Sequence, residues 1–315
     1  MNIDSIIKKT GFSKRSNYKS SLIKKTRRQR EFIIAFLFLA PWLIGIFVFT
    51  LWPFINSFIT SLHQSNLFSS TFIGLDNYKE LLGDWKFEKS FIVTIKFVLI
   101  AVPLRLAFAL FIAVILNNKL RGTNFFRSAM YLPSLIGGSV AIAAMWTQLF
   151  GPRGVVNHVL ALFGIEGTSW IANPGTALYV LIILGVWQFG SSMVIFLAGL
   201  RNIPGSLYEA CEIDGGSKIQ SFIHITLPML SPIILFNVVL QTINSFQTFT
   251  PAFIITKGGP LNETLFMVLY IYDKAFMSSE MGYASAMSWV LLLVILAVTG
   301  VLFFTSKYWV YYESE

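Results

Sequence analysis

The stretch that decides the fold runs from Leu207 to Pro232 and reads LYEACEIDGGSKIQSFIHITLPMLSP. Its first half keeps a helical period up to Asp214, and Gly215-Gly216 then supplies backbone angles that other residues resist. Ser217 is suited to cap a second helix, which has an apolar side. Pro228 is expected to end this second helix at the membrane. The stretch therefore predicts two short helices around a glycine turn.

Two interpretations of this helix pair are open. A compact, partly apolar pair of helices can dock into a groove on another protein. It can equally lie as an interfacial helix on the surface of a bilayer. The periodicity alone favours neither.

Long runs without charged residues flank the stretch. The nearest are Gly167–Leu200 and Ile219–Thr256, and each can hold the ~20 apolar residues that a membrane-spanning helix needs. Phe91–Leu116 is interrupted by Lys96 and Arg105 but is otherwise strongly apolar. Together the runs predict an all-α integral membrane protein with six transmembrane helices, at about residues 32–60, 90–117, 128–150, 175–200, 229–251 and 283–306.

The composition agrees with a membrane protein. Of the 315 residues, 55% are hydrophobic and only 12% are charged, whereas a soluble domain carries about 25% charged residues. The mean hydropathy is +0.67. These values exclude a soluble enzyme and a disordered protein. The single Cys211 allows no internal disulfide.

Motifs for intrinsic catalysis are absent from the sequence. There is no G-x-x-x-x-G-K-[ST] loop for ATP and no H-E-x-x-H zinc motif. The three histidines lie far apart, and no Cys/His cluster suggests a metal site. We therefore expect a chain that is not itself an enzyme and that binds no metal.

The charge distribution predicts the orientation. Residues 8–30 hold ten Lys or Arg, so the basic tail at 1–30 is expected in the cytoplasm. With six crossings, a first helix at 31–60 leads to an outer loop at 61–89, and a core at 90–306 ends in a cytoplasmic tail at 307–315. The cytoplasmic parts then hold 16 basic and 7 acidic residues, and the outer loops hold 6 and 8. The basic surplus is a topology signal, and nucleic-acid binding is not expected.

Polar residues recur inside two of the predicted helices. In the fifth, Asn237, Gln241, Asn244 and Thr248 follow one helical face, with Ser245 beside it. The fourth adds Gln188 and Ser191. Such a row of amides and hydroxyls can line a sugar pathway or bind neighbouring helices to each other. For the whole face the pathway is favoured, while for any single residue both interpretations stand.

Two basic residues interrupt the second predicted helix. Lys96 is close enough to its outer end to extend its ammonium to the interface. Arg105 lies deeper. It can pair with a backbone carbonyl, reach a water-filled cavity, or meet an anionic sugar such as a uronic acid.

The loop also carries a family pattern. Glu209-Ala210-Cys211 is followed by Gly215 and, after nine residues, by Ile225-x-Leu227-Pro228. This pattern resembles the EAA loop of binding-protein-dependent ABC importer permeases. Further segments are similar to the carbohydrate branch, the maltose-type F-subunit permeases: residues 72–78 (FIGLDNY), 121–127 (RGTNFFR), 131–133 (YLP), 257–260 (KGGP) and 309–313 (WVYYE).

The resemblance implies a type I ABC importer permease fold. This subunit would pair with a second permease in the cell membrane, with both termini cytoplasmic, and an extracellular solute-binding protein would deliver a sugar or oligosaccharide. Two separate ATPase subunits would hold ATP and Mg, so this chain would bind no cofactor. The docking residues on the loop would be Glu209, Ala210, Asp214, Gly215 and Gly216. In the family, the helix after the loop binds sugar, and Gln241, Asn244, Ser245 and Thr248 fall in the matching stretch.

The chain departs from the family pattern at two positions of the loop. Cys211 stands where a second Ala is expected, and it is small enough to pack there at little cost. Gly216 stands where Ala is usual, and it is expected to loosen the turn.

Three other functions are alternatives to sugar import by an ABC transporter. A permease of the same family could carry another solute, such as a sugar phosphate. An ion-coupled secondary transporter usually has inverted repeats and acids within the membrane, but the predicted spans hold no acid and no obvious repeat. A membrane anchor would need neither the polar face of the fifth helix nor a docking loop.

The topology is testable with two reporters. A reporter fused after Glu315 should lie in the cytoplasm, and one inserted near Gly164 should lie outside, because an odd number of predicted spans separates them. Alkaline phosphatase and green fluorescent protein fusions measure the two sides. The same side for both positions would contradict the six-helix map.

Overall fold

The computed structural model describes residues 31–32, 34–65, 69–118 and 122–311. The predicted basic tail at 1–30 and the last residues, 312–315, lie outside this part. The chain divides into two units, Met1–Ile59 and Thr60–Glu315. Apart from one small sheet, the regular structure of the described residues is helical.

The first candidate membrane span is Ile34–Ser61. It ends in η1 (Phe47–Leu51) and α2 (Trp52–Ser61). Residues 34–61 contain no charged side chain and are apolar on every side, which is the pattern of a helix surrounded by lipid or by other apolar helices.

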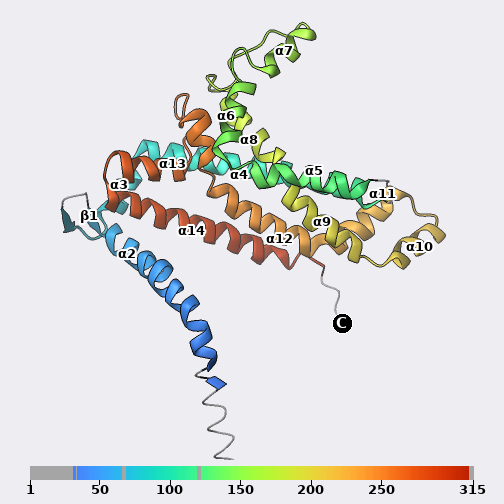
Figure 1. Ribbon diagram of the computed structural model, residues 1–315, viewed down its shortest axis with the longest axis horizontal. Helices are drawn as coiled ribbons and strands as arrows, with labels where there is room; N and C mark the ends of the chain where they lie inside the picture. The colour runs from blue at the N-terminus through green and yellow to red at the C-terminus, as the bar shows by residue number, and fades with distance from the viewer. Residues whose placement is uncertain (1–30, 33, 66–68, 119–121, 312–315) are drawn as a thin grey trace, which may run out of the picture. The chain divides into compact units, whose positions relative to one another are not determined.

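The second unit begins with an antiparallel pair of strands, β1 (His63–Ser65) and β2 (Ser70–Phe72), in which His63 lies opposite Phe72. The helices that follow are α3 (Asp76–Gly83), α4 (Trp85–Asn117), α5 (Thr123–Ile136), α6 (Val140–Leu149), α7 (Val155–Leu162), α8 (Ala177–Trp187), α9 (Gly190–Asn202), α10 (Gly205–Ile213), α11 (Lys218–Ser221), η2 (Phe222–Thr226), α12 (Leu227–Phe246), η3 (Ala252–Thr256), α13 (Met267–Tyr272), η4 (Asp273–Met277) and α14 (Met281–Ser306). Within this unit, α10 and α11 lie at the opposite end from α3 and α13 (Figure 1).

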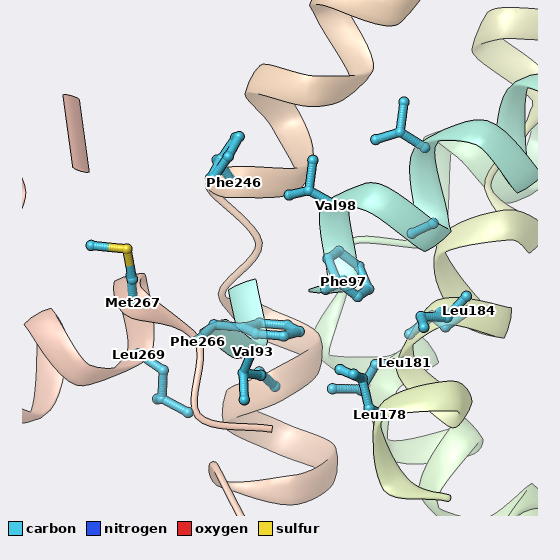
Figure 2. Packing of buried hydrophobic residues seen from close by; sticks show 14 of the residues in the cluster. Val93, Phe97, Val98, Leu178, Leu181, Leu184, Phe246, Phe266, Met267 and Leu269 are labelled. Atoms are coloured by element: carbon cyan, nitrogen blue, oxygen red, sulfur yellow. The ribbon is translucent and has the colours of Figure 1, made fainter. Parts of the chain in front are cut away.

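The core of the second unit forms where α4 packs against α8, α9, α12 and α13. Side chains of α4 lie between those of α8 and α13, and the rings of Phe97 and Phe266 are 4.8 Å apart (Figure 2). Small residues allow close approach elsewhere: Ala101, Ala109 and Ala113 of α4 are fully buried, as is usual where membrane helices pack.

The predicted spans are recovered with differences at their ends. Four described helices are long and apolar enough to cross a membrane, and two bent pairs raise the number to six. The second span begins at Trp85 rather than at 90, because the Asp84 side chain accepts a hydrogen bond from the backbone N–H of Lys86 and caps α4. The sixth, α14, starts two residues before the predicted 283.

The third predicted helix, 128–150, is not a single straight helix. It divides into α5 and α6, which are bent by 98°. Gly137 and Gly138 fall at the break, and Ser139 caps α6 by accepting a hydrogen bond from the N–H of Ile142. Apolarity predicted the span, but the glycine pair and the serine cap determine the bend. The fourth span is similarly divided into α8 and α9, bent by 41°.

The prediction that Pro228 ends the second loop helix is wrong. Helix runs without a break from Lys218 to Phe246, through α11, η2 and α12. Directly before the proline the chain forms a π turn, in which the N–H of Leu227 donates to the carbonyl of Phe222. In a regular α-helix the proline ring clashes with the carbonyl group four residues earlier. In a π turn the hydrogen bonds span five residues, so the spacing between the proline and that carbonyl group differs and the helix can continue.

Asp84 joins three elements at one end of the second unit. Besides capping α4, its carboxylate accepts hydrogen bonds from the Tyr270 hydroxyl of α13 at 2.6 Å and the Tyr283 hydroxyl of α14 at 2.7 Å. Burial raises the pKa of Asp84, but these hydroxyls and two backbone N–H groups outweigh it and hold the pKa below its ordinary value. The charged form is therefore the one that stabilises the fold.

We expect Asp84→Asn to lower the free energy of unfolding by about 1–2 kcal/mol. This value is toward the low end of the range for hydrogen bonds to charged groups, because the carboxylate is partly exposed. The pKa of Asp84 is lower in the folded protein than in the unfolded chain. Asp84 therefore contributes to the free energy of unfolding at pH values above the unfolded pKa, and this contribution is lost as the pH falls through the folded pKa. The melting temperature of the wild-type protein should thus fall more steeply below pH 4 than that of Asp84→Asn. Asp76→Asn, at an exposed ion pair with Lys79, is the control. Equal pH dependence of wild type and Asp84→Asn would refute this role.

Candidate functional site

A pocket of about 230 Å³ lies where the bent spans break. Its lining comes from α4, from α8 and its C-terminal end, from the break between α5 and α6, and from the chain that follows α12. The lining residues are Phe97, Arg105, Gly138, Leu181, Leu184, Gly185, Gln188, Gln247, Thr248, Phe249, Thr250 and Pro251. Both helix breaks contribute to it, through Gly138 and Gln188.

Hydrogen bonds join the two breaks to each other. The Ser134 hydroxyl donates to the carbonyl of Gln188 at 2.9 Å and accepts from the N–H of Ser191 at 2.9 Å. The Gln188 amide donates to the carbonyl of Gly137 at 3.3 Å. Backbone groups that leave a helix inside a membrane must be paired within the protein. The three hydrogen bonds therefore pair polar groups of the two breaks beside the pocket.

Arg105 reaches this pocket from α4. Its Nε donates to the carbonyl of Gly185 at 2.6 Å, and its Nη1 donates to Oε1 of Gln241 at 2.6 Å. Two of the three predicted environments, a backbone carbonyl and a cavity, thus occur together. The contact with Gln241 brings α12 to the site, although Gln241 itself does not line the pocket.

The residues predicted for the pathway divide into three groups. Gln188 and Thr248 line the pocket, and Gln241 contacts it through Arg105. Ser191 binds Ser134 through its backbone. Ser245 is buried, and its hydroxyl has no partner among the described residues, whereas Asn244 is exposed.

The polar residues predicted on one face of the fifth helix do not all lie on that face, because the helix is shorter than expected. The fifth span was predicted to extend to 251, but α12 ends at Phe246. Thr248 therefore lies in the irregular segment after the helix. Phe249 was not placed in the site by sequence, and for Arg105 the sequence left three environments open. The proline at 251 was the available signal that the helix stops early.

Aromatic rings border the pocket beside its polar groups. Phe249, a lining residue, stacks on Phe253 at 5.1 Å and lies 5.1 Å from Tyr272. Trp187, the neighbour of Gln188 in the sequence, does not line the pocket, and its ring lies 5.4 Å from that of Trp146. An aromatic wall with amide and guanidinium donors can contact both the apolar face and the hydroxyl edge of a small polar solute.

The loop that was predicted as two helices around a turn has this form. The backbone N–H of Gln220 donates to the Ser217 hydroxyl, and Oε1 of Gln220 accepts from the N–H of Ser217, which completes a capping box. Gly215 has φ +78°, which favours glycine. Glu209, Ala210, Asp214 and Gly215 are exposed, and Gly216 is half-buried.

The turn is tighter than the sequence suggested. The N–H of Gly216 donates to the carbonyl of Cys211 at 2.8 Å and that of Gly215 donates to Glu212 at 3.1 Å, which is the Schellman arrangement. A Cβ on Gly216 would overlap with Sγ of Cys211. The expectation that Gly216 loosens the turn is therefore wrong, since the space is filled by the thiol of Cys211.

The described residues contain no group of three or more His, Cys, Asp or Glu that could hold a metal.

Residues 91–310 match the family of binding-protein-dependent transport system inner membrane components. The chain belongs to this family. It is a multi-pass membrane permease of the ABC type, and ATP hydrolysis in this family is the task of a separate subunit. The resemblance to binding-protein-dependent ABC importer permeases is confirmed.

Several proteins resemble this permease over nearly their full lengths. The probable ABC transporter permease protein YesP of Bacillus subtilis is 52% identical, with 93% of this chain and 97% of YesP covered. The lactose transport system permease protein LacF of Rhizobium radiobacter is 35% identical over 86% and 93%. The arabinooligosaccharides transport system permease protein AraP of Bacillus subtilis is 33% identical over 84% and 85%.

A solved structure confirms the fold. A chain of a bacterial ABC transporter that imports the acidic polysaccharide alginate superposes with a TM-score of 0.78, covering 89% of this permease and 96% of that chain. The sequence identity is 21%, so the likeness concerns the fold. The predicted all-α, type I ABC importer permease fold with its membrane spans is thus the observed one.

The contact between Cys211 and Gly216 leads to a double-mutant prediction. Gly216→Ala should destabilise the loop by about 1–3 kcal/mol, because the added methyl group overlaps with the thiol. Cys211→Ala removes the sulfur but not the carbonyl oxygen of Cys211, which a Cβ on Gly216 would approach to 2.9 Å. The combination Cys211→Ala/Gly216→Ala should therefore recover part of that loss. Thermal unfolding of the four proteins gives the coupling. Additive effects of the two changes would rule out the steric link.

Proposed function

We propose that this permease translocates a sugar or oligosaccharide delivered by an extracellular solute-binding protein. The observation that carries the proposal is the pocket at the two helix breaks, where Gln188, Thr248 and Arg105 face an aromatic residue, Phe249. Hydroxyl-rich solutes need such a mixture of donors and an aromatic surface. Relatives named for lactose and for arabinooligosaccharides support the sugar class.

Energy for transport would come from two ATPase subunits that hold ATP and Mg. A second, similar permease would complete the pathway, and both termini of this chain would lie in the cytoplasm. The family description, which is binding-protein-dependent transport, supports the outer delivery partner.

The loop of α10 and α11 would dock on an ATPase subunit. Ile213 and Ile219 are 86% and 71% exposed on it, so its surface includes apolar side chains available to a partner. The charges on α10 and its cap are acidic, namely Glu209, Glu212 and Asp214, and α11 adds one basic residue, Lys218. A helix that lies on an anionic bilayer normally carries Lys and Arg instead. The charges therefore support a protein groove over the bilayer surface.

The transport class is tested by reconstitution. Proteoliposomes that contain both permeases, the ATPase and the binding protein should accumulate labelled sugar only when ATP is enclosed with the ATPase. Accumulation driven by a sodium or proton gradient without ATP would instead indicate a secondary transporter. A relative that is 34% identical is named for sn-glycerol 3-phosphate transport. If the importer carried this solute in preference to sugars, the proposed substrate would be a sugar phosphate-like solute instead of a sugar.

Docking is tested at the glycine turn. Gly215→Pro should abolish co-purification of the ATPase and reduce uptake at least about tenfold, because proline requires φ near −65° and Gly215 has +78°. The permease should still insert into the membrane. Gly164→Pro is the matched control, since Gly164 has a similar φ of +72° and is predicted on the other side of the membrane. Normal ATPase binding by Gly215→Pro, or equal loss in both variants, would contradict the docking site.

A further inference from the structure

We propose that Arg105 binds a carboxylate of the transported sugar, so that the substrate class is an acidic, uronate-containing oligosaccharide. This inference rests on the proposed sugar-import function and narrows its substrate.

The first argument is the uncompensated charge of Arg105. In the described ranges, ion pairs join Lys79 to Asp76, Lys89 to Glu263 and Lys274 to Glu280, and none includes Arg105. Its two partners, the Gly185 carbonyl and the Gln241 amide oxygen, are neutral. An arginine stays protonated in proteins, and an unpaired charge within a membrane span is unfavourable unless it faces a cavity or a partner. A bound anion would supply that partner.

The second argument is the position of the guanidinium group. Arg105 lines the pocket, and its Nη2 makes no hydrogen bond to any described residue. The bonds of Nε and Nη1 hold the planar group in place, so the remaining N–H donors are preorganised for a ligand. Gly185 contributes to this placement, because a Cβ there would lie 3.0 Å from Nη2. An oriented guanidinium group is well matched to a carboxylate, which it can bind through two parallel hydrogen bonds.

The third argument distinguishes a carboxylate from a phosphate. Arg105 is the one charged residue among those that line the pocket. Its single positive charge balances a carboxylate, whereas a phosphate monoester carries close to two negative charges near neutral pH. The other polar side chains that line the pocket, among them Gln188 and Thr248, are neutral and suit the hydroxyls of the same sugar. A monoanionic sugar acid therefore matches both the charge and the polar lining.

Lys96, on the same helix as Arg105, lies in the environment that is usual for a lysine near the end of a membrane span. It is exposed, does not line the pocket, and sits nine residues nearer the start of α4. It can extend its ammonium to the interface, which Arg105, hydrogen-bonded to α8 and α12, does not do. Lys96 thus provides a control for removing one positive charge from α4.

The experiment measures uptake of matched sugars by proteoliposomes with the complete importer and its binding protein. The probes are disaccharides of galacturonate, glucuronate, mannuronate and guluronate, each also offered as its neutral methyl ester, together with the corresponding neutral hexose disaccharides. For the acid that is transported, the uptake ratio of acid to ester should fall at least about tenfold in Arg105→Gln, since a charge-assisted hydrogen bond is stronger than a neutral one. The ratio within one variant cancels differences in expression and in binding-protein preference.

Two further variants separate charge from packing. Arg105→Lys keeps the charge and should show an intermediate ratio. Gln241→Glu places a carboxylate against Arg105 with almost no change in shape, and it should lower the ratio as strongly as Arg105→Gln. Lys96→Gln should leave the ratio unchanged.

Each outcome decides the question. Equal loss of acid and ester uptake in Arg105→Gln would show that Arg105 only joins helices, and the inference would be wrong. Import of neutral hexose disaccharides or of sn-glycerol 3-phosphate, with no uronate transported, would also overturn it while leaving ATP-driven import intact. If no sugar of any kind were imported with ATP present, the proposed function itself would fail.

Discussion

The structure depends on one constraint, that backbone N–H and C=O groups inside hydrocarbon must find partners within the protein. Two spans are interrupted, near Gly137 and near Gln188, and each interruption frees backbone groups. Ser134 and the Gln188 amide pair with these groups across the gap. Polar groups at each break thus form hydrogen bonds with polar groups at the other break. The irregular backbone at the breaks forms part of the pocket wall.

Much of the fold follows from the sequence because the requirement for apolarity is severe. A chain must provide about 20 apolar residues for each crossing, and the number and approximate positions of the spans follow from that requirement, while their ends and bends do not. The capping box at Ser217 was partly predictable too, since a serine after two glycines is a local signal. In both cases the cause lies within a few neighbouring residues.

The site was harder to predict because its residues meet through packing. Arg105 and Gln241 are 136 positions apart, and no local pattern links them. A helical face drawn through residues 237–248 assumed a regular helix, whereas α12 stops at Phe246. At Pro228 the error was opposite, since a π turn accommodates a residue that normally ends a helix. The two loop departures, Cys211 and Gly216, looked independent in sequence and are in contact in space.

The unbroken helix from Lys218 to Phe246 has a mechanical consequence. Its 29 residues correspond to a rod of about 43 Å at 1.5 Å per residue, with the glycine turn of the loop at one end and Gln241 near the other. A tilt at one end of a continuous helix displaces the other end, and the points at which this helix can bend are the π turn η2 and Pro232. If α11 docks on an ATPase subunit as proposed, a movement of α11 would reach the Gln241 amide, and the guanidinium that it holds, through this one helix. One continuous helix thus joins the proposed docking loop to the residue that holds Arg105 at the pocket.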